Sequence, residues 1–134
     1  MARMVINMAD FDGIQQMLDK VDKAARPETC KRMLEAAGQI YAQEMNNAVE
    51  SFHHVVSRDL MRSAKVVKVE ENSNGYWTAK VMYDGYDSKG VANDLKANIL
   101  LQEKDKKFLK AAQEAAKPKA AAEMQRILNE IIGG

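Results

Sequence analysis

The fold is decided by the stretch Ser57-Arg-Asp-Leu-Met-Arg-Ser-Ala-Lys-Val-Val-Lys-Val-Glu70, which leads through Asn74-Gly75 into Tyr76-Trp-Thr-Ala-Lys-Val-Met-Tyr83. The runs on either side of Asn-Gly are rich in valine or in aromatic residues, which favour strands. Asn-Gly between two such runs is a strong signal for a β-hairpin. We therefore predict a hairpin over residues 63–83.

The hairpin could form in either of two registers, which differ in the side chains that they place opposite each other. A two-residue turn at Asn74-Gly75 would place Val69 opposite Lys80, whereas a three-residue loop that includes Ser73 would place Val69 opposite Ala79. A one-residue slip moves every side chain to the other face. The apolar match therefore favours the longer loop, with Gly75 in the left-handed conformation. The predicted buried face consists of Val67, Val69, Trp77, Ala79 and Val81, with Val67 opposite Val81.

The residues before the hairpin predict a short strand, Met4–Ile6, and a helical pair over residues 10–54. Their apolar residues form two stripes with spacings of three and four, the period of an amphipathic helix. We expect Asp10 to cap the first helix, Pro27 to lie in the first turn of the second, and the two helices to pack antiparallel. The stripes are Phe11, Ile14, Leu18, Val21 and Ala25, then Cys30, Leu34, Ala37, Tyr41, Met45, Ala48 and Phe52.

The residues after the hairpin predict a loop with a short helix over 84–102, followed by a long C-terminal helix over 106–132. One apolar stripe continues across Pro118, which indicates a single kinked helix. The predicted fold is therefore α+β, with two N-terminal helices, a hairpin in a small antiparallel sheet, a short helix and a long C-terminal helix. We expect one domain over residues 1–134. The C-terminal stripe is Leu109, Ala112, Ala116, Ala120, Met124, Ile127 and Ile131.

The composition excludes several classes of protein. The chain has 134 residues, of which 46% are hydrophobic and 29% charged, and its net charge of +1 gives no global attraction to nucleic acid. No apolar run approaches the length of a membrane span. Residues 1–5 lack the apolar core of a signal peptide, so we expect synthesis in the cytoplasm.

The residue types that carry catalysis or bind metals are few. The single cysteine, Cys30, excludes an internal disulfide and a multi-cysteine metal site. It lies on an apolar stripe, which favours a buried position over a nucleophilic role. The adjacent His53 and His54 would point in different directions on a helix, which makes them a poor joint metal site. We expect no enzyme activity, no metal and no cofactor.

The order of elements resembles the tail-component family, small head–tail junction proteins of lambda-like tailed phages. The resemblance rests on Val56–Ser63 before the hairpin, on Gly85–Gly90 with its Gly-Tyr-Asp, and on Phe108–Ala111 at the start of the last helix. Family members carry Thr-Gly where this chain has Ser57-Arg58, and Pro where it has Lys107. The resemblance implies a non-enzymatic virion protein, made in the bacterial host cytoplasm, that assembles as a homo-oligomeric ring. Its implied partners are connector, head-closure and tail proteins, and DNA passing through the ring without sequence specificity.

The unpaired edges of a hairpin independently favour self-association, because a two-stranded hairpin needs further strands or a partner. The Ala-rich face of the last helix offers a second small-residue contact. We expect no membrane partner. The candidate subunit-interface residues are Tyr83, Gly85, Tyr86, Phe108, Ala112, Ala116 and Ala120.

A nucleic-acid-binding module is the alternative hypothesis from another class of protein. It would use the basic residues Arg58, Arg62, Lys65 and Lys68 near the hairpin. A steep dependence of DNA affinity on salt would favour this module, whereas concentration-dependent assembly without DNA would favour the structural protein.

Overall fold

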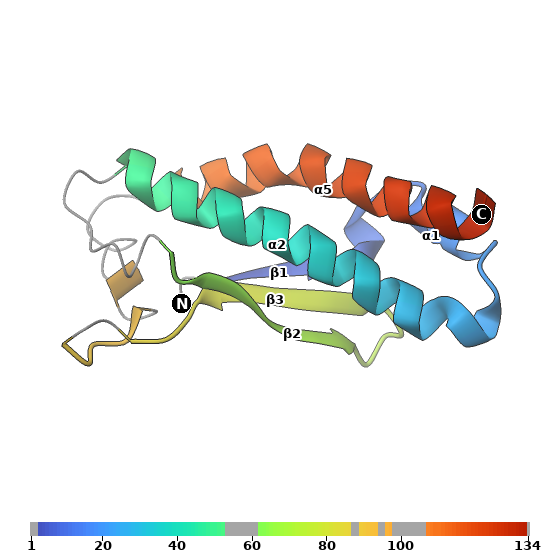
Figure 1. Cartoon of the computed structure of the whole chain (residues 1–134), viewed down its shortest axis with the longest axis horizontal. Helices are drawn as coiled ribbons and strands as arrows, with labels where there is room; N and C mark the ends of the chain where they lie inside the picture. Colours follow the sequence, from blue (N-terminus) through green and yellow to red (C-terminus); the bar gives the residue numbers. More distant parts are fainter. Residues whose placement is uncertain (1–2, 53–61, 87–88, 94–95, 98–106, 134) are drawn as a thin grey trace.

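A layer of helices lies on one face of a three-stranded antiparallel sheet (Figure 1), which confirms the predicted α+β class. The computed structural model describes residues 3–52, 62–86, 89–93, 96–97 and 107–133. The elements, in chain order, are β1 (Arg3–Asn7), η1 (Met8–Asp10), α1 (Ile14–Leu18), η2 (Lys23–Ala25), α2 (Arg26–Phe52), β2 (Ala64–Glu71), β3 (Trp77–Tyr83) and α5 (Lys107–Gly133).

The sheet has the order β1-β3-β2, so the second strand of the hairpin is central. The predicted N-terminal strand is confirmed, because β1 pairs with β3 and Ile6 lies opposite Ala79. The three-residue hairpin loop is also confirmed. Asn72 N donates to Tyr76 O at 2.7 Å across the loop, and Gly75 adopts a φ of 83°. Only glycine adopts this left-handed conformation without strain.

A β-bulge changes the pairing of the first hairpin strand. Val69 lies opposite Ala79 as predicted, but the register shifts between Val66 and Lys68, so Val66 lies opposite Val81. The predicted pair of Val67 with Val81 is therefore wrong. Val67 is the extra residue of the bulge, and 38% of its surface is exposed. A bulge adds one residue to a strand and turns the residues beyond it to the other face.

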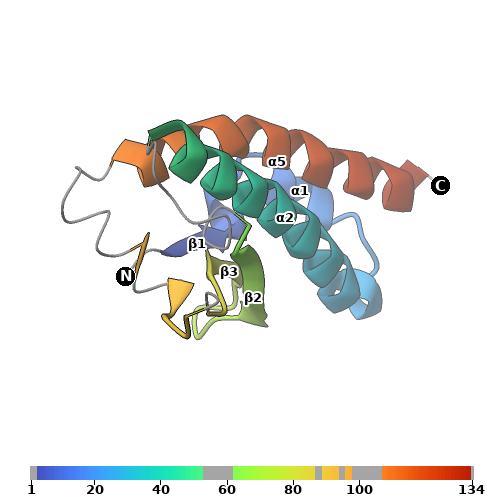
Figure 2. The same cartoon turned by 60° about the vertical axis from the view of Figure 1, so that its left-hand side comes forward.

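The helix layer is built from α2 and α5, which pack along each other above the sheet (Figures 1 and 2). The six predicted stripe residues of α2 from Cys30 to Ala48 are buried, as expected. The side chain of the seventh, Phe52, lies outside the described residues. α2 also crosses the sheet closely, because a Cβ on Gly38 would overlap Val66 Cγ2.

The first predicted helix is shorter than expected. Its regular part, α1, spans only five residues and follows Gly13, whose φ of 82° interrupts a continuous helix. Asp10 lies inside η1, where Asn7 is the capping residue, so the predicted cap is wrong. The antiparallel pairing of the first two helices is also wrong, because the long partner of α2 is α5. Pro27 lies in the first turn of α2, as predicted.

The C-terminal helix is one continuous element with Pro118 inside it, as predicted. Its stripe residues from Ala112 to Ile127 are buried, whereas Pro118 is exposed. Most of the predicted short helix in residues 84–102 lies outside the described residues. Of that stretch, Asn93, Lys96 and Ala97 are helical.

Candidate functional site

Four of the predicted interface residues lie inside the protein. Ala112, Ala116 and Ala120 are at most 2% exposed, and they belong to the same core cluster as Met45 of α2. Their small side chains face the core of the same chain, where α5 packs on α2. The prediction that they contact a neighbouring subunit is therefore wrong, because the sequence pattern shows a small-residue face without showing which helix covers it.

Tyr83, the fourth of these residues, is also part of the core. Its side chain is fully buried, and its hydroxyl donates a hydrogen bond of 2.6 Å to Met45 O on α2. Burial raises the pKa of the Tyr83 phenol far above its ordinary value, since the charged form would lose its hydration. Tyr83 therefore joins sheet to helix, and the prediction of a subunit contact is wrong for it as well.

Gly85 and Tyr86 do lie at the surface. Tyr86 is 74% exposed and forms an isolated bridge with Ala92. Asn93 N donates to Gly85 O at 3.0 Å and Asn93 Nδ2 donates to Asp84 O at 3.0 Å, so this loop is tied to the start of the next segment. The side chain of the remaining interface residue, Phe108, lies outside the described residues. The exposed Tyr86 thus follows backbone that Asn93 holds by two hydrogen bonds.

The outer edge of β2 lies along a groove of about 640 Å³. The strand contributes the consecutive residues Ala64–Val69 to this groove. The facing side of α2 contributes mostly polar side chains, among them Glu35, Gln39 and Gln43. An edge strand that lines a groove in this way can accept a further strand.

The backbone directions of β2 follow from two hydrogen bonds at its ends. Asp84 N donates to Ser63 O at 2.8 Å, and Asn72 N donates to Tyr76 O at 2.7 Å. Alternate residues of an antiparallel pair direct their peptide groups to opposite sides. The peptide groups of Ala64 and Glu71 therefore point away from β3. Asn46 of α2 accepts a hydrogen bond from Ala64 N at 3.1 Å and so covers the first outward donor of this edge.

The other edge of the sheet, β1, borders a second groove of about 280 Å³. Residues 4–7 of β1 line one side, and Gln113 and Lys117 of α5 line the other. The two edges lie on opposite sides of the sheet, with β3 between them. Sequence reasoning identified the exposed hairpin edge but not the grooves, because their helical walls come from distant parts of the chain.

The chemistry of the described residues is sparse. Burial, and to a lesser extent the carboxylate of Glu71, raise the pKa of the Cys30 thiol to about 11 although Arg26 opposes the shift. The thiol therefore stays protonated at neutral pH and is a weak nucleophile. Within the described part of the chain, no three His, Cys, Asp or Glu side chains are grouped closely enough to hold a metal ion. His53 and His54 lie outside the described residues.

The basic residues of the nucleic-acid hypothesis fall into two groups. Arg58 lies outside the described residues, and Arg62 lies beside the loop of Gly85. Lys65 and Lys68 both lie on β2, opposite Met82 and Lys80 of β3. The sequence hypothesis did not include Lys80, although the register of the three-residue loop already places it opposite Lys68. Of these lysines, the bulge changes only the position of Lys65, which it brings to the same face.

Comparisons of this chain with protein-family models, with curated proteins and with solved structures found no match. None of the helices that the structure describes is both long enough and apolar enough to span a bilayer.

Proposed function

We propose that this chain is a non-enzymatic structural protein of a phage head–tail junction, which assembles with copies of itself into a ring. The resemblance of Val56–Ser63, Gly85–Gly90 and Phe108–Ala111 to tail-component proteins supports the proposal. The observation that carries it is the outer edge of β2, which lies open along a groove beside α2. Strand edges of this kind associate with strands of other chains.

The two edges of the sheet suit a ring better than a symmetric dimer. A ring requires a head-to-tail contact between two different surfaces of the subunit. The edge of β2 beside α2 and the edge of β1 beside α5 are two such surfaces on opposite sides. In the proposed assembly, the β2 edge of one subunit receives the β1 edge of the next. The ring binds connector, head-closure and tail proteins in the virion.

Blocking each groove separately tests this arrangement. Gln39→Trp fills the β2 groove from α2, and Gln113→Trp fills the β1 groove from α5; both positions are exposed. Gln125→Trp adds the same side chain at an exposed position of α5 that lines neither groove, so it is the control. The measurement is mass by light scattering across protein concentration, with circular dichroism to confirm folding.

We expect the wild type and Gln125→Trp to grow in mass with concentration and to form rings in electron micrographs. Each groove variant alone stays monomeric. An equal mixture of Gln39→Trp and Gln113→Trp forms dimers and stops there, because each partner retains one open edge. A wild type that remains monomeric at high concentration and with its connector present contradicts the proposal. Assembly that both variants leave unchanged contradicts the edge contact.

A further inference from the structure

None of α1, α2 and α5 covers the lower face of the sheet, because all three lie on the other side (Figures 1 and 2). The register defines three rows of residues on this face. Met82 and Lys65 form the first row; Val5, Lys80 and Lys68 form the second; and Asn7, Thr78 and Glu70 form the third. Three lysines therefore share this face with one carboxylate, in a chain whose net charge is only +1.

The bulge at Val67 places Lys65 on the same face as Lys68 and Lys80. Lys65 and Lys68 are three residues apart, so a regular strand would place them on opposite faces. The extra residue puts both on the uncovered face, where Lys65 lies opposite Met82 and Lys68 lies opposite Lys80. Bulges often re-aim side chains in this way beside functional sites.

The pair of Lys68 and Lys80 is unfavourable for the sheet itself. Like charges directly opposite each other on neighbouring strands are destabilising. Glu70 forms an exposed ion pair of 3.1 Å with Lys68, which offsets little of the repulsion because such pairs are weak. Lysine on an edge strand is a common defence against aggregation. That role cannot apply to Lys80, which lies on the central strand.

We propose that the uncovered sheet face, centred on Lys65, Lys68 and Lys80, binds the phosphate backbone of double-stranded nucleic acid. The three rows contain no aromatic residue on which bases of a single strand could stack, and the exposed Tyr76 lies beyond them at the hairpin end. Its lysines suit a sequence-independent contact with phosphates. Insertion into an anionic membrane would instead require larger apolar side chains than Val5 and Met82.

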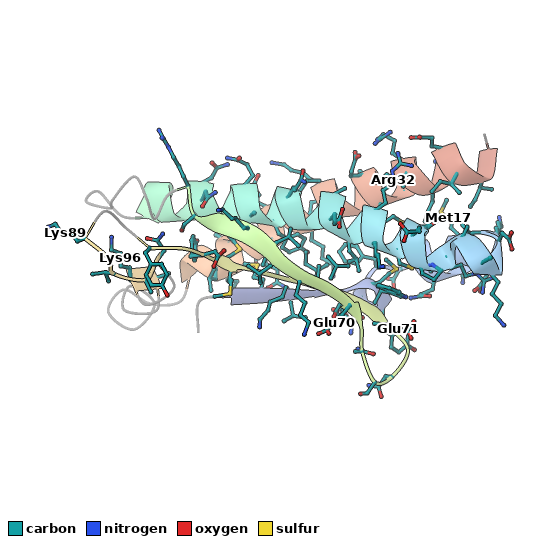
Figure 3. All side chains as sticks on the ribbon, turned by 60° about the horizontal axis from the view of Figure 1, so that its bottom comes forward. Met17, Arg32, Glu70, Glu71, Lys89 and Lys96 are labelled. Carbon is teal, nitrogen blue, oxygen red and sulfur yellow. The ribbon has the colours of Figure 1, made fainter. Side chains whose placement is uncertain are left out.

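The charges along the molecule also indicate where a duplex lies on this face. Glu70 and Glu71 mark the hairpin end, whereas Lys89 and Lys96 lie at the opposite end (Figure 3). A polyanion is therefore disfavoured at the hairpin end of this face. The contact does not depend on ring formation, because all three lysines belong to one chain.

The variant Lys80→Glu tests nucleic-acid binding without weakening the sheet. The variant places a carboxylate opposite Lys68, so it removes the repulsion in the sheet and at the same time introduces repulsion toward phosphates. Lys110→Glu makes the same change of charge at an exposed position of α5, in the helix layer, and is the matched control. The probe is a labelled 30-base-pair duplex, in two unrelated sequences, followed by fluorescence anisotropy from 50 to 300 mM salt.

We expect the wild type to bind both duplexes equally, with log affinity falling against log salt with a slope of about −3 for three phosphate contacts. Lys80→Glu weakens binding about tenfold at low salt and reduces the slope by about 1, without lowering Tm. Lys110→Glu stays within about twofold of the wild type, because its charge lies far from the bound phosphates. Should Lys80→Glu lower Tm, Lys68→Glu makes the same opposite-charge pair from the edge strand.

Three results would overturn the inference. One is an equal loss of duplex affinity in Lys80→Glu and Lys110→Glu, which would reflect net charge alone. Another is duplex binding that does not respond to salt. The third is binding to phosphatidylserine vesicles in place of the duplex, which would make an anionic membrane the partner. Assembly is scored separately on the Gln39→Trp and Gln113→Trp variants, so failure of the ring and failure of this contact remain distinguishable.

Discussion

The two faces of β3 differ sharply in burial and in charge. Ala79, Val81 and Tyr83 are fully buried against the helices, whereas Lys80 and Met82 on the other face are only partly covered. Packing explains the choice of every residue on the first face. It does not explain Lys80 opposite Lys68, which lowers the stability of the sheet. Stability therefore governs one face of this strand, while the other face tolerates an unfavourable pair.

Substitutions that exchange valine and lysine between the two faces of β3 should produce the largest difference in the free energy of unfolding. Val81→Lys buries an unpaired charge under α2, which should reduce the free energy of unfolding by about 3–5 kcal/mol. Lys80→Val, one residue away on the open face, should change it by less than about 1 kcal/mol. Urea denaturation followed by circular dichroism measures both. Similar losses in the two variants would show that the faces do not differ.

The close approach of α2 to the buried face gives the second prediction. Gly38→Ala should destabilise the protein by about 1–3 kcal/mol, because the added methyl would overlap Val66 Cγ2 and β-branched valine has little freedom to move. Helix propensity alone would instead stabilise by about 1 kcal/mol. A less stable Gly38→Ala variant therefore supports the overlap with Val66, whereas a more stable one contradicts it. Adding Val66→Ala should relieve the overlap, so fully additive losses in the double variant would contradict this contact.

Removal of the Tyr83 hydroxyl should have a somewhat smaller effect. Tyr83→Phe loses the hydrogen bond of 2.6 Å to Met45 O, which should cost about 1–2 kcal/mol. Tyr76→Phe, at an exposed position in the hairpin loop, is the control. A loss no larger than that of the control would mean that the buried hydroxyl contributes nothing to stability.

Tyr83 also makes the free energy of unfolding depend on pH in the alkaline range. Burial raises the pKa of Tyr83 in the folded state, so above the ordinary tyrosine pKa of about 10 the unfolded state releases its proton first. Stability from this group is fully present below pH 10 and falls as the pH rises above it. The fall should be shallower in Tyr83→Phe, and equal slopes in the two proteins would contradict the buried phenol.

The smallest effect concerns the open face. Lys80→Glu should stabilise the protein by about 0.2–1 kcal/mol, because it replaces a like-charge pair by an opposite-charge pair. The gain should shrink at high salt and disappear in a Lys68→Gln background. A gain that survives in that background would show that the pair with Lys68 is not its cause. Thermal unfolding at low and high salt measures each difference.

The elements that depend on local chemistry could be predicted from the sequence. Asn72–Tyr76 specified the loop and the left-handed Gly75, because few residue types adopt that conformation. The stripe from Cys30 to Ala48 and the stripe across Pro118 specified two long helices and their buried faces. The first helix was predicted too long, because the spacing of its apolar residues concealed the break at Gly13.

What covers each face depends on packing between distant segments, which local patterns do not reveal. The Ala112–Ala120 face is apolar whether it meets α2 or another subunit, and burial against α2 cannot be read from periodicity. The position of the bulge was equally hidden, since Val66 and Val67 are both valines. α2 approaches Val66 at Gly38, which places Val66 inward and leaves Val67 as the extra residue. That contact between distant segments brings Lys65 and Lys68 to one face, because a one-residue shift in a strand reverses every side chain beyond it.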